Sequence, residues 1–158
     1  MQQLSGLENS LATLFKGLPH IPRDWRHWLA DKAWWLALIG VVIGCLGILG
    51  FMPVTLGITI FTGITHGPAA GALVIITSIV NMAVLVVSIA LESMAITPLK
   101  ARRKRGWDLL FLVILVTFTG AVLNTLITGN VDHIIGLIIG TLIGLYVLFE
   151  VRMYFVHK

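Results

Sequence analysis

The sequence predicts an all-α polytopic membrane protein, a four-transmembrane-helix bundle preceded by an N-terminal amphipathic interfacial helix. Hydrophobic residues make up 58% of the 158 residues and charged residues only 11%, whereas a soluble domain typically carries about 25% charged residues. Four apolar runs long enough to cross a bilayer extend over about residues 33–51, 70–97, 107–127 and 134–155. Little sequence remains for a separate soluble domain, so we expect a single membrane domain over residues 1–158.

The positions of the basic residues predict the orientation of the four spans. All 11 Lys and Arg residues lie before the first run, between the second and third runs, or near the C-terminus. Lys and Arg accumulate on the cytoplasmic side of spanning helices, so we expect both termini in the cytoplasm. The link between the second and third spans, called the basic loop, contains Lys100, Arg102, Arg103, Lys104 and Arg105. Because this charge is explained by topology, we expect a lipid bilayer and no nucleic acid as a partner.

Residues 5–17 are expected to form the amphipathic helix at the inner membrane surface. Leucines at steps of three and four share one face of this helix, namely Leu4, Leu7, Leu11, Leu14 and Leu18. Ser5 and Glu8 have the spacing of a capping box, and Gly17 and Pro19 supply a stop. So short a helix is marginal in water. It therefore either lies on lipid or docks onto a partner protein.

The first and fourth spans carry glycines at spacings that favour close helix packing. These glycines are Gly40, Gly44 and Gly47 in the first span and Gly136, Gly140 and Gly144 in the fourth. We favour the hypothesis that these glycines pack inside the four-helix bundle, because short loops join the helices. The alternative is a contact between copies in a homo-oligomer.

Residues 53–68, between the first two spans, are uncharged and long for an ordinary turn. Four of them share one helical face, namely Thr55, Thr59, Thr62 and His66, which suggests an interfacial or re-entrant piece. The apolar alternation from Val54 to Ile60 leaves an extended conformation open. The other outer connection, residues 128–133, reads as a short polar turn.

The second span carries a polar stripe, whose members lie within about 60° of one another on a helix. The stripe consists of Thr77, Asn81, Ser88 and Glu92. Because lipid offers no partner for polar groups, we expect Asn81 to form a hydrogen bond with the third span. A polar pathway for an ion or small solute, ending at Glu92, is the functional hypothesis. The structural alternative is helix–helix hydrogen bonding, with Glu92 paired to Lys100 or Arg102 at the inner interface.

All five tryptophans lie at predicted cytoplasmic ends of spans, where indole rings favour the headgroup boundary. They are Trp25, Trp28, Trp34, Trp35 and Trp107. We expect them to form an anchoring belt.

No motif in the sequence specifies a reaction. The glycines occur inside apolar runs rather than in phosphate-binding loops, and no nucleophile elbow is present. His66 and His133, with Asp132, are candidates for a metal or a tetrapyrrole. These residues do not have the sequence spacing of metal ligands, so we expect solvent-facing histidines and no metal or cofactor. Because no reaction motif is present, we also expect no catalytic residue.

Two segments of the second half, residues 106–111 (GWDLLF) and 143–152 (IGLYVLFEVR), resemble small bacterial four-helix inner-membrane proteins. The resemblance implies a multi-pass inner-membrane protein and assigns no activity to any residue. We expect a non-enzymatic structural or accessory subunit that binds other membrane proteins, in a membrane complex or a homo-oligomer. The alternatives are a small ion or solute channel or transporter that uses the polar stripe, and a pigment- or haem-binding subunit.

Overall fold

The computed structural model describes residues 20–131 and 134–156, which form five α-helices and no strand. The helices are α2 (Arg23–His66), α3 (Pro68–Lys100), α4 (Lys104–Thr128), α5 (Ile134–Val151) and the short α6 (Met153–Val156). The first four are long and apolar enough to cross a membrane. The chain is therefore an all-α, multi-pass membrane protein, as predicted. The expected amphipathic helix, with its leucine face from Leu4 to Leu18, lies outside the described residues.

The first predicted span and the connection at 53–68 are one continuous helix. This excludes the extended conformation left open for 53–68 and also a piece separate from the first span. α2 runs for 44 residues and passes through Pro53. Proline lacks an amide hydrogen and interrupts a helix locally. In lipid, however, every other backbone group must still bond internally, so an uncharged segment remains helical beyond it. The Thr65 hydroxyl donates to the Phe61 carbonyl one turn earlier, at 2.8 Å. The helix ends at His66 and is followed by Gly67, whose φ is 92°.

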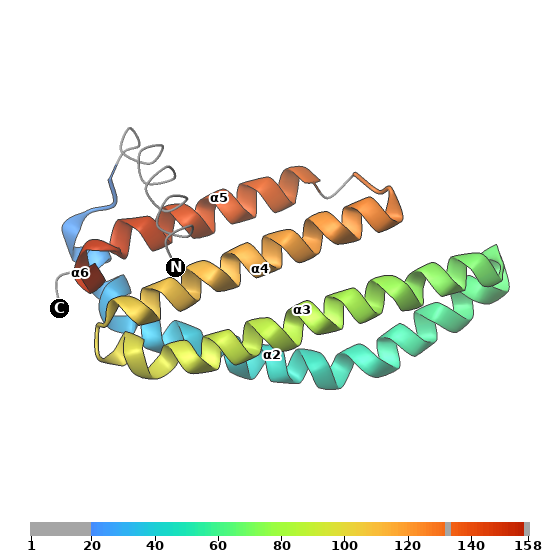
Figure 1. The fold of residues 1–158 in the computed structure, drawn as a ribbon, viewed down its shortest axis with the longest axis horizontal. Helices are drawn as coiled ribbons and strands as arrows, with labels where there is room; N and C mark the ends of the chain where they lie inside the picture. The colour runs from blue at the N-terminus through green and yellow to red at the C-terminus, as the bar shows by residue number, and fades with distance from the viewer. Residues whose placement is uncertain (1–19, 132–133, 157–158) are drawn as a thin grey trace.

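The helices form two antiparallel hairpins of unequal length that lie side by side (Figure 1). At 1.5 Å per residue, α2 and α3 are about 66 and 50 Å long, and α4 and α5 about 37 and 27 Å. The α2–α3 hairpin consequently extends beyond the other at one end of the bundle. Its helices approach closely there, since a Cβ at Gly71 would lie 3.3 Å from the Gly63 Cα.

At the opposite end, a three-residue turn joins α3 to α4. The Arg103 amide donates to the Pro98 carbonyl at 2.8 Å, and the Arg102 amide donates to the Leu99 carbonyl at 3.0 Å. These two bonds form a Schellman motif, in which Arg102 holds the left-handed position with φ of 50°. The Arg102 guanidinium also forms an ion pair with Asp31 of α2, which ties the turn to the first helix.

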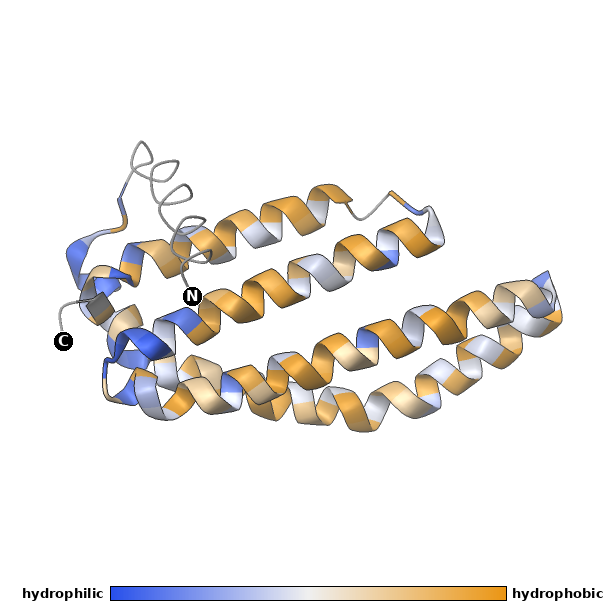
Figure 2. Ribbon diagram, in the orientation of Figure 1, coloured by the Kyte–Doolittle hydropathy of each residue, from blue (hydrophilic) through white to orange (hydrophobic). Residues whose placement is uncertain are grey.

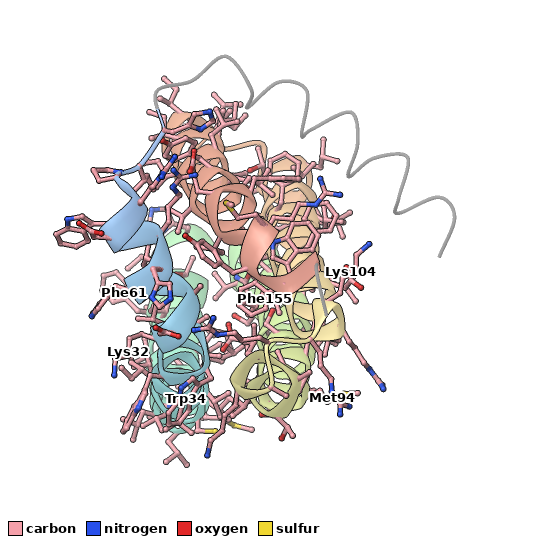
Figure 3. All side chains as sticks on the ribbon, turned by 90° about the vertical axis from the view of Figure 1, so that its left-hand side faces the viewer. Lys32, Trp34, Phe61, Met94, Lys104 and Phe155 are labelled. Atoms are coloured by element: carbon pink, nitrogen blue, oxygen red, sulfur yellow. The ribbon has the colours of Figure 1, made fainter. Side chains whose placement is uncertain are left out.

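All described Lys and Arg residues lie at this end, which we call the basic end and define as residues 20–32, 98–108 and 148–156. Hydrophilic residues are concentrated there, whereas apolar residues cover the length of the helices (Figure 2). An end-on view places Lys32 and Lys104 at the periphery and Phe155 between the helices (Figure 3). The core also concentrates in this half of the bundle, and the largest fully buried side chains among the described residues are Trp107, Phe155 and Leu99.

Two details of the basic end differ from the sequence prediction. Trp107 is only 1% exposed, so it is a core residue and not part of the interfacial belt. By contrast, Trp25, Trp28 and Trp35 are exposed, as an anchoring belt requires. The fourth span, predicted over 134–155, ends as a helix at Val151. A tight turn at Arg152, whose amide donates to the Phe149 carbonyl at 3.2 Å, then leads into α6.

Gly106 is the position at which a side chain would most disturb this arrangement. A Cβ there would lie 2.7 Å from the Leu99 nitrogen and 3.0 Å from the Pro98 carbonyl carbon, which are backbone atoms. We predict that Gly106→Ala lowers the free energy of unfolding by about 1–3 kcal/mol, measured as loss of thermal stability in mild detergent. Gly57→Ala is the control, because a Cβ at Gly57 meets nothing within 4 Å. Equal stability of the two variants would contradict the packing described for the α3–α4 turn.

Candidate functional site

The polar stripe of α3 is divided among different environments. The Thr77 hydroxyl donates to the Leu73 and Val74 carbonyls of its own helix, at 3.0 and 3.1 Å. Asn81 accepts a hydrogen bond from the Asn124 side-chain amide of α4 at 3.1 Å, so the expected bond to the third span is present. Ser88 is buried, and no described residue bonds its hydroxyl. Glu92 is half-buried and lies in a separate cavity.

The first cavity, called the outer cavity, surrounds the Asn81–Asn124 pair. Its volume is about 330 Å³, and it lies between α3, α4 and α5. Its polar lining residues are Asn81, Thr117, Asn124, Thr125, Thr128 and Asn130. The threonine hydroxyls of this set donate to carbonyls one turn earlier in α4. Asn81 and Asn124 share only one hydrogen bond, so amide groups of both side chains remain able to bond a further partner.

The second cavity, called the inner cavity, contains Glu92. Its volume is about 280 Å³, and all four long helices line it. Every other lining residue is apolar, namely Leu29, Ala33, Leu36, Ala37, Leu110, Val113, Ile114, Gly144, Val147, Leu148 and Val151. The inner cavity is thus an apolar space with a single carboxyl group.

Gly40 of α2 makes the space that the Glu92 carboxyl group occupies. A Cβ at position 40 would lie 2.7 Å from Glu92 Oε2 and 3.3 Å from its carboxyl carbon. Any larger residue at this position would displace the carboxyl group. The contact between Gly40 and Glu92 therefore positions the one ionisable group that the described residues place in the inner cavity.

The basic side chains near Glu92 in sequence are engaged elsewhere, contrary to the expected pairing with Lys100 or Arg102. Lys100 Nζ lies 5.2 Å from the centre of the Trp34 ring, and Arg102 pairs with Asp31. Glu92 lies eight residues before Lys100, which places it about 12 Å further along the helix. No described residue forms a hydrogen bond or ion pair with it.

The two cavities are not one continuous pathway in the described part of the chain, because no residue lines both. Tight packing occurs between them, since a Cβ at Gly120 of α4 would lie 2.4 Å from Val84 Cγ2 of α3. Val84 and Gly120 form a wall of the outer cavity. The stripe predicted as a single polar face therefore serves two separate sites.

The glycines of the first and fourth spans have different surroundings. Gly40 and Gly44 lie against Glu92 and Ile89 of α3, while Gly47 only just meets Leu85, at 4.0 Å. In α5, Gly144 lies against Ile114 of α4, whereas Cβ atoms at Gly136 and Gly140 would meet nothing within 4 Å. Two of the six glycines thus face open space.

Ion pairs hold α2 to the C-terminal part of the chain at the basic end. Glu150 of α5 is buried, and its Oε1 lies 2.8 Å from His20 Nδ1. Arg26 Nε lies 3.5 Å from Glu150 Oε2, an ion pair without the geometry of a hydrogen bond. The Asp31 carboxylate pairs both with His27, whose Nδ1 lies 3.0 Å from Oδ2, and with Arg102 of the basic loop. These pairs are not among the predictions made from the sequence. The pairs of Glu150 and the Asp31–Arg102 pair join residues that only the fold brings together, whereas the His27–Asp31 pair has the local i, i+4 spacing of a helix.

Of the basic loop, Lys100 and Arg102 thus contact α2, while Arg103, Lys104 and Arg105 are exposed. His66 lies at the other end of α2, where its Nδ1 is 2.6 Å from the Thr65 hydroxyl oxygen. His133 and Asp132 lie outside the described residues. Within the described ranges, no three His, Cys, Asp or Glu side chains are grouped as a metal site would need.

The sequence alone does not indicate that Gly40 is a neighbour of Glu92, or that Leu36 and Val147 line the same cavity. The glycine spacing indicated that Gly40 belongs to a packing face, but no local signal indicates which helix that face meets. Comparison of the chain with protein-family models, with curated proteins and with solved structures finds no match. The site is therefore interpreted from its own geometry.

The Arg26–Glu150 pair gives a direct test of the basic end. We predict that Arg26→Met lowers the free energy of unfolding by about 2 kcal/mol, because a buried carboxylate loses a cationic partner and retains only His20. The double variant Arg26→Met/Glu150→Met should recover most of this loss, since both charges are then removed. Thermal unfolding in detergent measures both effects. A double variant less stable than Arg26→Met would argue against the pair.

Proposed function

We propose that this chain is a non-enzymatic accessory or structural subunit that binds another membrane protein through the outward face of α5. The observation that carries the proposal is the open space at Gly136 and Gly140. In lipid, helices associate through small residues that allow close backbone approach and through hydrogen bonds between helices. α5 offers the first of these features, and the adjacent outer cavity offers the second.

The outer cavity supports a partner helix of particular chemistry. Leu137 of α5 lines this cavity and precedes Gly140 by one helical turn, so the glycine face and the cavity are neighbours. The Asn81–Asn124 pair lies in the cavity with amide groups that can bond further. A transmembrane helix with small residues and one hydroxyl or amide side chain would fit both features. The leucine face at residues 4–18 and the exposed part of the basic loop are proposed as additional contacts.

A channel has less support from the geometry. A conduction pathway along the polar stripe would need the two cavities to join, and the Val84–Gly120 contact lies between Asn81 and Glu92 along α3. The hydrogen bond with Asn124 gives Asn81, the one amide side chain of the stripe, a structural role. Each such bond contributes about 0.6–1.7 kcal/mol in a membrane.

The proposed location is a bacterial inner membrane, with the basic end and both termini in the cytoplasm. Support comes from the concentration of all described Lys and Arg residues at one end of the bundle and from the preference of such residues for the cytoplasmic side. The resemblance of residues 106–111 and 143–152 to small inner-membrane proteins supports the choice of membrane.

This orientation predicts the accessibility of single cysteines in intact cells. In a Cys45→Ser background, Asn130→Cys should react with a membrane-impermeant maleimide added outside, whereas Lys104→Cys should react only after the cells are permeabilised. Asn130 is exposed in the connection after α4, and Lys104 is exposed at the start of α4. The reverse labelling pattern would invert the topology and would remove the cytoplasmic assignment.

The α5 face predicts the effect of a bulky side chain on partner binding. Gly140→Leu should leave the fold intact, because nothing lies within 4 Å of its Cβ position, and should reduce a co-purifying membrane protein at least tenfold. Gly57→Leu is the matched control, since that glycine of α2 also faces open space. Tagged variants are purified from the native membrane in mild detergent and their partners quantified by mass spectrometry. Equal recovery of every partner with both variants would remove α5 as the binding face.

A further inference from the structure

The inner cavity has the composition of a binding site for a molecule that carries a positive charge on an apolar body. Among the described residues, Glu92 is its only polar lining residue. An ionisable side chain within a membrane-spanning segment is costly to keep there. Such a residue is therefore expected to have a partner, and no described residue supplies one to Glu92.

The bundle is shaped to keep the Glu92 carboxyl group in this cavity. Glycine at position 40 leaves room for Glu92 Oε2, because a Cβ at this position would collide with that oxygen. Ala33 and Ala37 of the same helix are small, buried and also line the cavity. Three small residues on successive turns of α2 thus leave space beside the carboxyl group.

The lining excludes two kinds of occupant. Metal cations such as Ca²⁺ need about 6–8 oxygen ligands, and the cavity offers the oxygens of one carboxyl group. An apolar transmembrane helix would leave the charge of the Glu92 carboxylate without a partner. A compact organic cation meets both requirements.

We propose that the inner cavity binds a compact lipophilic cation, an ammonium or amidinium group with apolar substituents. Its charge lies against the Glu92 carboxylate, where low polarity strengthens the ion pair. Its apolar part lies against Leu36 of α2, Ile114 of α4 and Val147 of α5. Leu36 is 50% exposed, so it marks the side from which a molecule dissolved in the bilayer enters. This site is separate from the partner face proposed for α5.

The test compares two probes of the same shape that differ in charge. Benzyltrimethylammonium carries a permanent positive charge, and neopentylbenzene has carbon in place of its nitrogen. Binding to the full chain in phosphatidylcholine nanodiscs is measured by equilibrium dialysis, and partition into empty nanodiscs is subtracted. We expect the cation to bind at least tenfold more tightly than the neutral probe, and Glu92→Gln to weaken the cation at least tenfold.

Two further pairs of variants locate the site within the bundle. Gly40→Ala should weaken the cation several-fold, because its Cβ displaces the carboxyl group, whereas Gly50→Ala, on the same helix in open space, should not. Val147→Phe should fill the cavity and weaken both probes, whereas Ile139→Phe, at an exposed position of α5, should leave binding unchanged. Gel filtration and thermal unfolding identify any variant that fails to fold, and the comparison of the two probes on the unaltered chain does not depend on variants.

Three results would overturn the proposal. Equal affinity for the two probes would reduce the site to an apolar space. Unchanged affinity of Glu92→Gln for the cation would separate the carboxyl group from binding. Weakening by Ile139→Phe but not by Val147→Phe would place the probe outside the inner cavity. Gly140→Leu should bind the cation normally, so failure of this proposal is distinguishable from failure of the proposed partner face.

Discussion

The burial of Trp107 is the constraint on which the arrangement of the other helices depends. Its indole follows directly after the α3–α4 turn, is 1% exposed, and donates from Nε1 to the Leu148 carbonyl of α5 at 2.8 Å. The ring stacks on Phe111, with centroids 5.4 Å apart and an interplanar angle of 8°, and meets the edge of Phe149. Arg152 lies over its face, 5.7 Å from the centroid. One side chain thus connects the turn, both helices of the second hairpin and the segment that leads to α6.

Fixing the bundle at this end leaves the other end less tightly packed. The fully buried side chains and the long-range ion pairs lie near Trp107, while the outer parts of α2 and α5 carry exposed apolar residues and glycines in open space. Lipid accepts exposed apolar side chains without cost, so a membrane protein does not need a core along its whole length. The outer cavity and the open glycines of α5 lie in this outer part of the bundle, away from the ion pairs of the basic end.

The sequence was informative where the signal is local and less so where it depends on helix pairing. Hydrophobic runs and clustered Lys and Arg predicted the spans and the basic end, since each follows from residues close together in the chain. For residues 53–68 the sequence leaves an interfacial, a re-entrant and an extended piece open, because an apolar run and a threonine face fit more than one of them. In lipid an uncharged segment continues as helix, so these residues extend the first span. Trp107 was assigned to the interface because its position at a span end matches that of the other tryptophans. Only the fold reveals that Phe111, Leu148 and Phe149 cover it.

Glu92 and Glu150 illustrate two ways in which the same side chain is accommodated in this bundle. Glu150 is buried, and His20 and Arg26 from the start of the chain's first described segment reach it. Glu92 lies about 12 Å from the end of its helix, beyond Lys100 and Arg102, whose contacts are with Trp34 and Asp31. If Glu92 served only to join helices, we would expect a hydrogen-bond donor on the facing turn of α2. Asn124 of α4 is such a donor for Asn81. Instead the facing residue is Gly40, which gives the carboxyl group space but no bond. Among the described residues, the combination of a carboxyl group, a glycine opposite it and an apolar cavity beside it is the geometry on which the proposed cation site rests.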